Sequence, residues 1–181
     1  LQAWEFIDID KARTAAYKSQ EAIDKHEPTG RLHGIPLGVK DIFYTTGMPT
    51  EAGASFWSGF IPQYDATCIS RIQAEGGIIL GKTVTTQFAD GDPARSINPW
   101  NAEHTPGGSS TGSAVAVAAR MIPAALGSQT VGSVLRPAAY NGVVGFKPSY
   151  GRISKYGVVE YATSFDHVGF IARSVEDTAL L

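Results

Sequence analysis

The chain of 181 residues carries 15 Lys and Arg against 17 Asp and Glu, a formal net charge of −2. Its 43% hydrophobic and 18% charged residues exclude a disordered or low-complexity chain. A nucleic-acid binder is excluded because no basic cluster is present to neutralise phosphates. The single Cys excludes an intramolecular disulfide and a cysteine zinc site, and no apolar run is long enough to span a bilayer.

The two ends of the chain indicate a piece of a longer product. The chain begins with Leu1 rather than Met, and its mixed, acidic start lacks the basic and apolar segments of a secretion signal. Near the other end, Ser174 fits the N-cap of a helix with Asp177 in its first turn, but no stop signal follows. We therefore expect a truncated protein that works in the cytoplasm, without a membrane partner.

The first half of the chain predicts helices that alternate with short buried strands. Residues 8–25 form an amphipathic helix. Its apolar stripe is Ile9, Ala12, Ala16, Ala22 and Ile23. Residues 34–39 are an apolar run typical of a buried strand, and Asp65 is expected to cap a helix over residues 66–75. Residues 78–80 follow as a β-branched strand, which we expect to leave the sheet at Gly81.

The second half begins with a loop rich in Pro, Asn and Gly over residues 90–109. Residues 111–121 form a helix of small side chains that can approach its neighbours closely. Residues 124–126 and 143–146 are further short apolar runs. Alternating helices and short strands, without the two-residue periodicity of a sandwich and without a linker, predict one α/β layered domain over the whole chain.

Two segments match the residue patterns of well-known motifs, but the elements predicted around them do not fit those motifs. Residues 76–83 satisfy the phosphate-loop pattern, yet a helix precedes them and the supposed loop has the composition of a strand. Residues 108–112 satisfy the Gly-x-Ser-x-Gly nucleophile elbow, yet a loop precedes them. The only His after Ser110 is His167. We reject both the nucleotide-binding and the α/β-hydrolase interpretations.

Three other segments remain unusual for their chemistry. Lys40 follows an apolar strand, where burial would favour its neutral form, although many such lysines reach solvent. Residues 107–113 place three Ser and a Thr among glycines before a helix, which also fits a Ser-rich N-cap. Residues 127–133 could direct several N–H groups at one point, or form a plain loop. Together they predict a Ser nucleophile activated by a neutral Lys through a second hydroxyl.

With these segments in this order, the chain resembles the amidase signature family. The resemblance covers essentially the whole chain, from the helix before Gly34-Ile35-Pro36 to Asp166-His167-Val168-Gly169. Its motifs are Val39-Lys40-Asp41, Thr105-Pro106-Gly107-Gly108-Ser109-Ser110, Gly132-Ser133 and Gly142-Val143-Val144-Gly145-Phe146-Lys147-Pro148. The resemblance implies a layered α/β/α fold with a mixed central sheet, of which this chain is the N-terminal part.

The resemblance also implies a role for each site residue. Ser133 matches the nucleophile, Ser109 the bridging serine after a cis peptide bond, and Lys40 the base. Ser110 matches a supporting hydrogen-bond role. The implied oxyanion hole is the N–H groups of Thr130, Val131, Gly132 and Ser133. The implied reaction is hydrolysis of a small-molecule amide through an acyl-serine, without metal or organic cofactor, and a homo-oligomer is left open.

Departures from the family pattern leave alternatives. Gln129 stands in place of an acid, Val131 in place of a glycine, Arg136 one position late, and Asn141 where Cys is frequent. A β-branched Val131 should limit the backbone angles at the oxyanion hole. These changes favour a stand-alone amidase over an amidotransferase A-type subunit, with a catalytically silent binding protein as a further alternative. We expect Asp41 to orient nearby backbone, and Arg136 either to pair with a carboxylate or to border the pocket.

Overall fold

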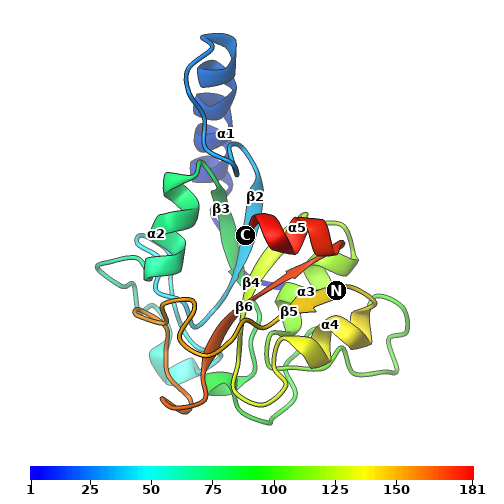
Figure 1. Ribbon diagram of the computed structural model, residues 1–181. Helices are drawn as coiled ribbons and strands as arrows, with labels where there is room; N and C mark the ends of the chain where they lie inside the picture. The colour runs from blue at the N-terminus through cyan, green and yellow to red at the C-terminus, as the bar shows by residue number, and fades with distance from the viewer.

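A computed structural model describes residues 1–181 and contains one mixed six-stranded sheet (Figure 1). Its order is β1-β3-β2-β4-β6-β5. The central strands β3, β2 and β4 run parallel, while β1, β6 and β5 are antiparallel to their neighbours. The strands are β1 (Trp4–Ile7), β2 (Pro36–Lys40), β3 (Ile78–Thr83), β4 (Ala124–Gln129), β5 (Val144–Phe146) and β6 (His167–Ala172).

Helices cover both faces of this sheet because its strands are apolar on both sides. The helices are α1 (Ile9–Asp24), α2 (Thr67–Ala74), α3 (Thr111–Ala118), α4 (Leu135–Asn141) and α5 (Val175–Leu180). On one face, Leu126 of β4 packs in a core of 17 buried residues with Ile69 of α2. On the other face, Ala125 packs in a core of 10 buried residues with α3 and α4. Two cores separated by one sheet give the expected α/β/α layers.

Helix α1 differs most from its prediction. Its bounds match, but of its residues only Ala12 is buried, while Ile9 and Ile23 of the predicted apolar stripe are 55% and 51% exposed. Figure 1 shows the reason, since the far end of α1 projects away from the sheet. Apart from Ala12, the apolar stripe of this helix is therefore not buried in the core.

Several boundaries also differ from their predictions. Asp65 does not cap α2, because its carboxylate accepts a hydrogen bond from the Thr46 N–H instead. Strand β3 does not leave the sheet at Gly81 but pairs with β2 as far as Thr83. Helix α3 ends before Arg120, which has a left-handed φ of 58°. Strands β1 and β6 and helix α4 were not predicted. At the chain's end, Ser174 caps α5 through the Asp177 N–H, as expected.

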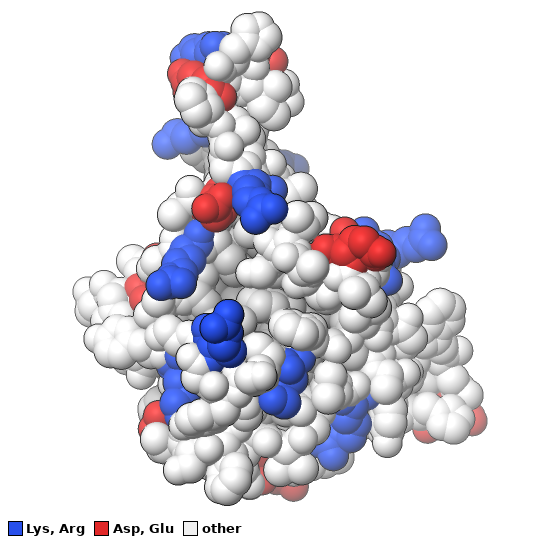
Figure 2. Space-filling view, viewed as in Figure 1, with Lys and Arg blue, Asp and Glu red and all other residues white.

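The surface carries charges of both signs. On the face shown in Figure 2, Lys and Arg side chains are separated by uncharged atoms and do not form one continuous patch. None of the helices has the length and apolarity needed to cross a membrane.

Candidate active site

Lys40 is the last residue of β2, at the centre of the sheet between β3 and β4. Its side chain is completely buried, and its Nζ donates hydrogen bonds to Ser109 Oγ at 2.6 Å and to Ser128 Oγ at 2.8 Å. Burial lowers the pKa of the Lys40 amine to about 7, against an opposing effect of the Asp166 charge. A substantial fraction of this amine is therefore neutral near pH 7.

Ser109 lies in the loop before α3, and the Gly108–Ser109 peptide bond is cis. The carbonyl of Gly108 accepts two hydrogen bonds from Arg136, from Nε at 3.0 Å and from Nη2 at 2.8 Å. Arg136 thus pairs with a backbone carbonyl rather than with a carboxylate. It also lines a hollow beside Gly107 and Thr111.

Ser110 joins the loop before α3 to β4 and to the turn that follows β4. Its Oγ donates to the Ser128 carbonyl at 3.2 Å and accepts from the Ser128 N–H at 3.2 Å. Its N–H donates to the Ser133 carbonyl at 3.1 Å. The Ser133 backbone therefore lies beside Ser109 and Ser110. The Ser133 residue is 8% exposed, and its hydroxyl makes no hydrogen bond, so no direct bond links it to Ser109 in this structure.

The turn from Thr130 to Ser133 follows β4 directly. None of its four backbone N–H groups donates a hydrogen bond to another protein atom. The φ of Val131 is not in the left-handed region, so a β-branched residue can adopt this backbone, and Val131 is 88% exposed. The substitution of Val for glycine is accommodated by an outward-pointing side chain.

Two buried residues of β4 lie at this site, within the segment of residues 127–133 that the sequence singled out, but no side-chain role was predicted for them. Ser128 is the second hydrogen-bond partner of Lys40, and Gln129 bonds to the turn that carries Ser133. The available signal was a polar pair, Ser128 and Gln129, just after the apolar run of residues 124–126.

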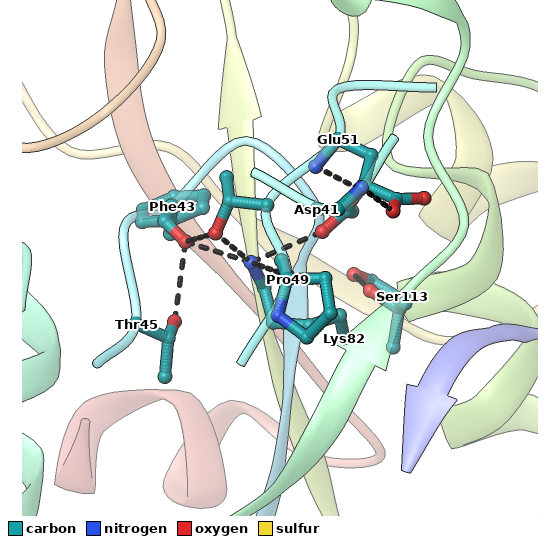
Figure 3. Close-up of polar contacts among 10 residues, drawn as sticks. Asp41, Phe43, Thr45, Pro49, Glu51, Lys82 and Ser113 are labelled. Carbon is teal, nitrogen blue, oxygen red and sulfur yellow. Dashed lines mark hydrogen bonds and ion pairs between the residues drawn. The ribbon is translucent and has the colours of Figure 1, made fainter. Parts of the chain in front are cut away.

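A second buried lysine lies on the neighbouring strand (Figure 3). Lys82 of β3 pairs with the Asp41 carboxylate at 3.0 Å, and both side chains are almost fully buried. The Lys82 ammonium also donates to the Phe43 carbonyl, the Pro49 carbonyl and Thr50 Oγ1. All of its bonding capacity is used inside the fold, which confirms that residues 76–83 are not a phosphate loop. Asp41 accepts from the Glu51 N–H, which confirms its predicted backbone role.

Comparison with known proteins identifies the family. A family model described as Amidase matches residues 1–181. The chain belongs to the amidase family. In sequence it is 46% identical to the A-type subunit of the glutamyl-tRNA(Gln) amidotransferase of Anaeromyxobacter sp. (strain K), over 100% of this chain and 38% of that protein.

Solved structures of other amidases show the same fold. Peptide amidase from Stenotrophomonas maltophilia has a TM-score of 0.91 and 37% identity over 99% of this chain and 39% of its own. An amidase family protein from Bacillus anthracis has a TM-score of 0.94 and 34% identity over 99% of this chain and 38% of its own. The chain thus spans about two fifths of the length of these amidases.

Proposed function

We propose that the protein is an amidase that hydrolyses the C–N bond of a small-molecule carboxylic amide through an acyl-serine. Family membership supports the reaction class. The hydrogen bond of 2.6 Å between the buried Lys40 amine and Ser109 Oγ, beside the Ser133 turn, is the observation that carries the proposal. An amine and a hydroxyl in this arrangement can transfer a proton without His.

In the proposed mechanism, neutral Lys40 accepts the proton of Ser109 while Ser109 accepts that of Ser133. The Ser133 Oγ forms a bond to the amide carbon, and the carbonyl oxygen takes the negative charge. The free N–H groups of residues 130–133 would stabilise this oxyanion. The proton then returns through Ser109 to the nitrogen, the C–N bond breaks, and water hydrolyses the acyl-serine by the same relay in reverse.

Labelling with a fluorophosphonate probe tests the proposal, because the nucleophile displaces fluoride and keeps the phosphonyl group. We expect one adduct, which peptide mapping places on Ser133. Ser133→Ala and Lys40→Ala should each abolish labelling and amide turnover, while Ser149→Ala, at an exposed serine, should change neither. Ligand binding without any adduct would instead indicate a catalytically silent relative.

A second candidate function is that of an amidotransferase A-type subunit, which the 46% identity to such a subunit favours. The two candidates differ in what they need. A stand-alone amidase should hydrolyse simple amides by itself, whereas an amidotransferase component should do so only with its partner chains. Turnover of a panel of simple amides by the purified protein, with no other chain present, would support the first candidate.

The extent of the chain bears on this assay. Relatives are more than twice as long, so residues outside this chain could complete the walls around Lys40 and Ser133. We propose that residues 1–181 are a single partial amidase signature domain, active in the cytoplasm as part of a longer chain. The 181-residue chain should turn over amides far more slowly than a longer natural chain that contains it, and equal rates would contradict this.

A further inference from the structure

Gln129 is the last residue of β4 and immediately precedes the turn of residues 130–133. It is 3% exposed, and both ends of its side-chain amide are bonded. Its Oε1 accepts from the Val134 N–H and the Leu135 N–H, each at 2.9 Å. Its Nε2 donates to the Val131 carbonyl at 3.2 Å. One side chain therefore bonds to both the beginning and the end of the turn that presents Ser133.

The acceptor end of Gln129 caps helix α4. The helix begins after Val134, whose side chain has no oxygen that could accept from the first N–H groups. Gln129 Oε1 accepts two of these N–H groups from outside the helix. It thereby fixes the position at which the chain leaves the turn, directly after Ser133.

The donor end of Gln129 fixes one peptide plane within the turn. The Val131 carbonyl and the Gly132 N–H belong to the same planar peptide group, so holding the oxygen also sets the direction of the N–H. The Val131 carbonyl accepts no other hydrogen bond, and the exposed Val131 side chain offers little packing to hold it. The orientation of the Gly132 N–H thus depends on Gln129.

We propose that Gln129 is a positioning residue that pre-orients the oxyanion-binding N–H of Gly132, an inference that rests on the proposed amidase function. A carboxylate at this position could not do the same, because it only accepts hydrogen bonds and has no donor for the Val131 carbonyl. The amide thus provides an anchor for a turn in which a valine, rather than a glycine, precedes Gly132.

Gln129→Glu tests the donor separately from the acceptor. The variant keeps an oxygen for the Val134 and Leu135 N–H groups but replaces the donor with a second acceptor, which repels the Val131 carbonyl. Removal of a whole oxyanion donor lowers kcat by about 10²–10³-fold, so misorientation of one should lower it about tenfold. We expect KM to change less than about threefold, since such a donor acts mainly in the transition state.

Two control variants separate positioning from charge. Gln73→Glu adds the same charge at an exposed position of α2 and should leave kcat unchanged. Gln129→Met is uncharged and of similar length, so it should also lower kcat. The acid limb of the pH profile should stay near pH 7 in Gln129→Met, because this variant brings no charge toward Lys40. Normal kcat in Gln129→Met would show that the Glu variant acts through its charge and would overturn the proposal.

A readout independent of activity distinguishes failure of this inference from failure of the proposed function. In NMR relaxation, the order parameter of the Gly132 N–H should fall in Gln129→Glu from the rigid range, about 0.85, toward 0.6. The positioning role alone would be overturned if the probe labels the wild type while Gln129→Glu shows the same labelling rate and the same Gly132 order parameter as the wild type. If the wild type is never labelled at Ser133, the amidase function fails, and the positioning role in that reaction fails with it, whatever the order parameter shows.

Discussion

The environment of Lys40 sets the pH at which its amine can act as a base. Because burial lowers its pKa to about 7, the amine is mostly protonated below this pH and mostly neutral above it. We expect kcat/KM for a simple amide to rise about tenfold per pH unit below pH 7 and to level off above it. A pH–rate profile between pH 5 and 9 measures this. A flat profile would contradict a role for Lys40 as the base.

Residues differ in how far their roles could be predicted from sequence. Lys40 was proposed as a site residue because an apolar run ends at it, and Ser109 and Ser133 because their motifs resemble a family. The side-chain hydrogen bonds of Gln129 and Ser128 were not predicted, because they depend on which atoms the fold brings together. Lys40 and Ser128 are far apart in sequence, yet Lys40 Nζ lies 2.8 Å from Ser128 Oγ.

Within β3, the buried ion pair of Lys82 and Asp41 joins the strand to the segment after β2. Lys82→Met would leave the Asp41 carboxylate buried without its partner charge. We expect this variant to lose about 3–5 kcal/mol of unfolding free energy, measured by urea denaturation. Lys82→Met combined with Asp41→Asn removes both charges and should lose less than Lys82→Met alone. If the double variant is the less stable of the two, the pair is not coupled as we describe.

Helix α3 packs through Gly112 against the residues that flank β1 and β3. A Cβ added at Gly112 would lie 2.2 Å from the Ala3 carbonyl oxygen and 2.4 Å from the Val84 nitrogen, both backbone atoms that cannot move aside alone. Gly112→Ala should therefore destabilise the protein by about 1–3 kcal/mol or more, despite the higher helix propensity of Ala. Gly91→Ala is the matched control, because nothing lies within 4 Å of its added Cβ. Equal thermal midpoints for the two variants would contradict this close approach.

Elements were predicted where local signals and tertiary structure agree. Helix α5 is capped by its own N-cap residue, Ser174, so its start was predicted correctly. The N-cap residue of helix α4 is Val134, whose apolar side chain cannot accept a hydrogen bond. The Gln129 side chain accepts in its place, and no local sequence pattern indicates this. Strand β6 was missed because Gly169 interrupts its apolar run, at a point where an added Cβ would lie 2.6 Å from the Phe146 carbonyl oxygen.

In the whole molecule, the candidate site forms where the parallel strands end. β2 ends at Lys40 and β4 at Gln129, so the turns after adjacent strands meet at one edge of the sheet. Crevices at the carboxyl ends of parallel strands are the usual ligand sites of α/β proteins. The two apolar cores hold these strands from both faces, which explains how an amine can be fully buried there.

Helix α1 is the one long element that these cores do not hold along its length. Ile23, near its projecting end, is 51% exposed, so its replacement removes little packing in the chain described here. Ile23→Gln should change the unfolding free energy by less than about 0.5 kcal/mol. Ile69→Ala in α2 removes a side chain that is fully buried in the core of 17 residues, so it should lower the unfolding free energy by about 2–5 kcal/mol.

Urea denaturation at several protein concentrations measures the unfolding free energies of Ile23→Gln in α1 and of Ile69→Ala in α2. If the projecting end is free, the two variants and the wild type should each show a midpoint that is independent of concentration. A loss of more than about 1 kcal/mol in Ile23→Gln that grows with protein concentration would contradict a free helix. It would show instead that a second copy of the chain covers the apolar stripe, and so decide the question of a homo-oligomer that the sequence leaves open.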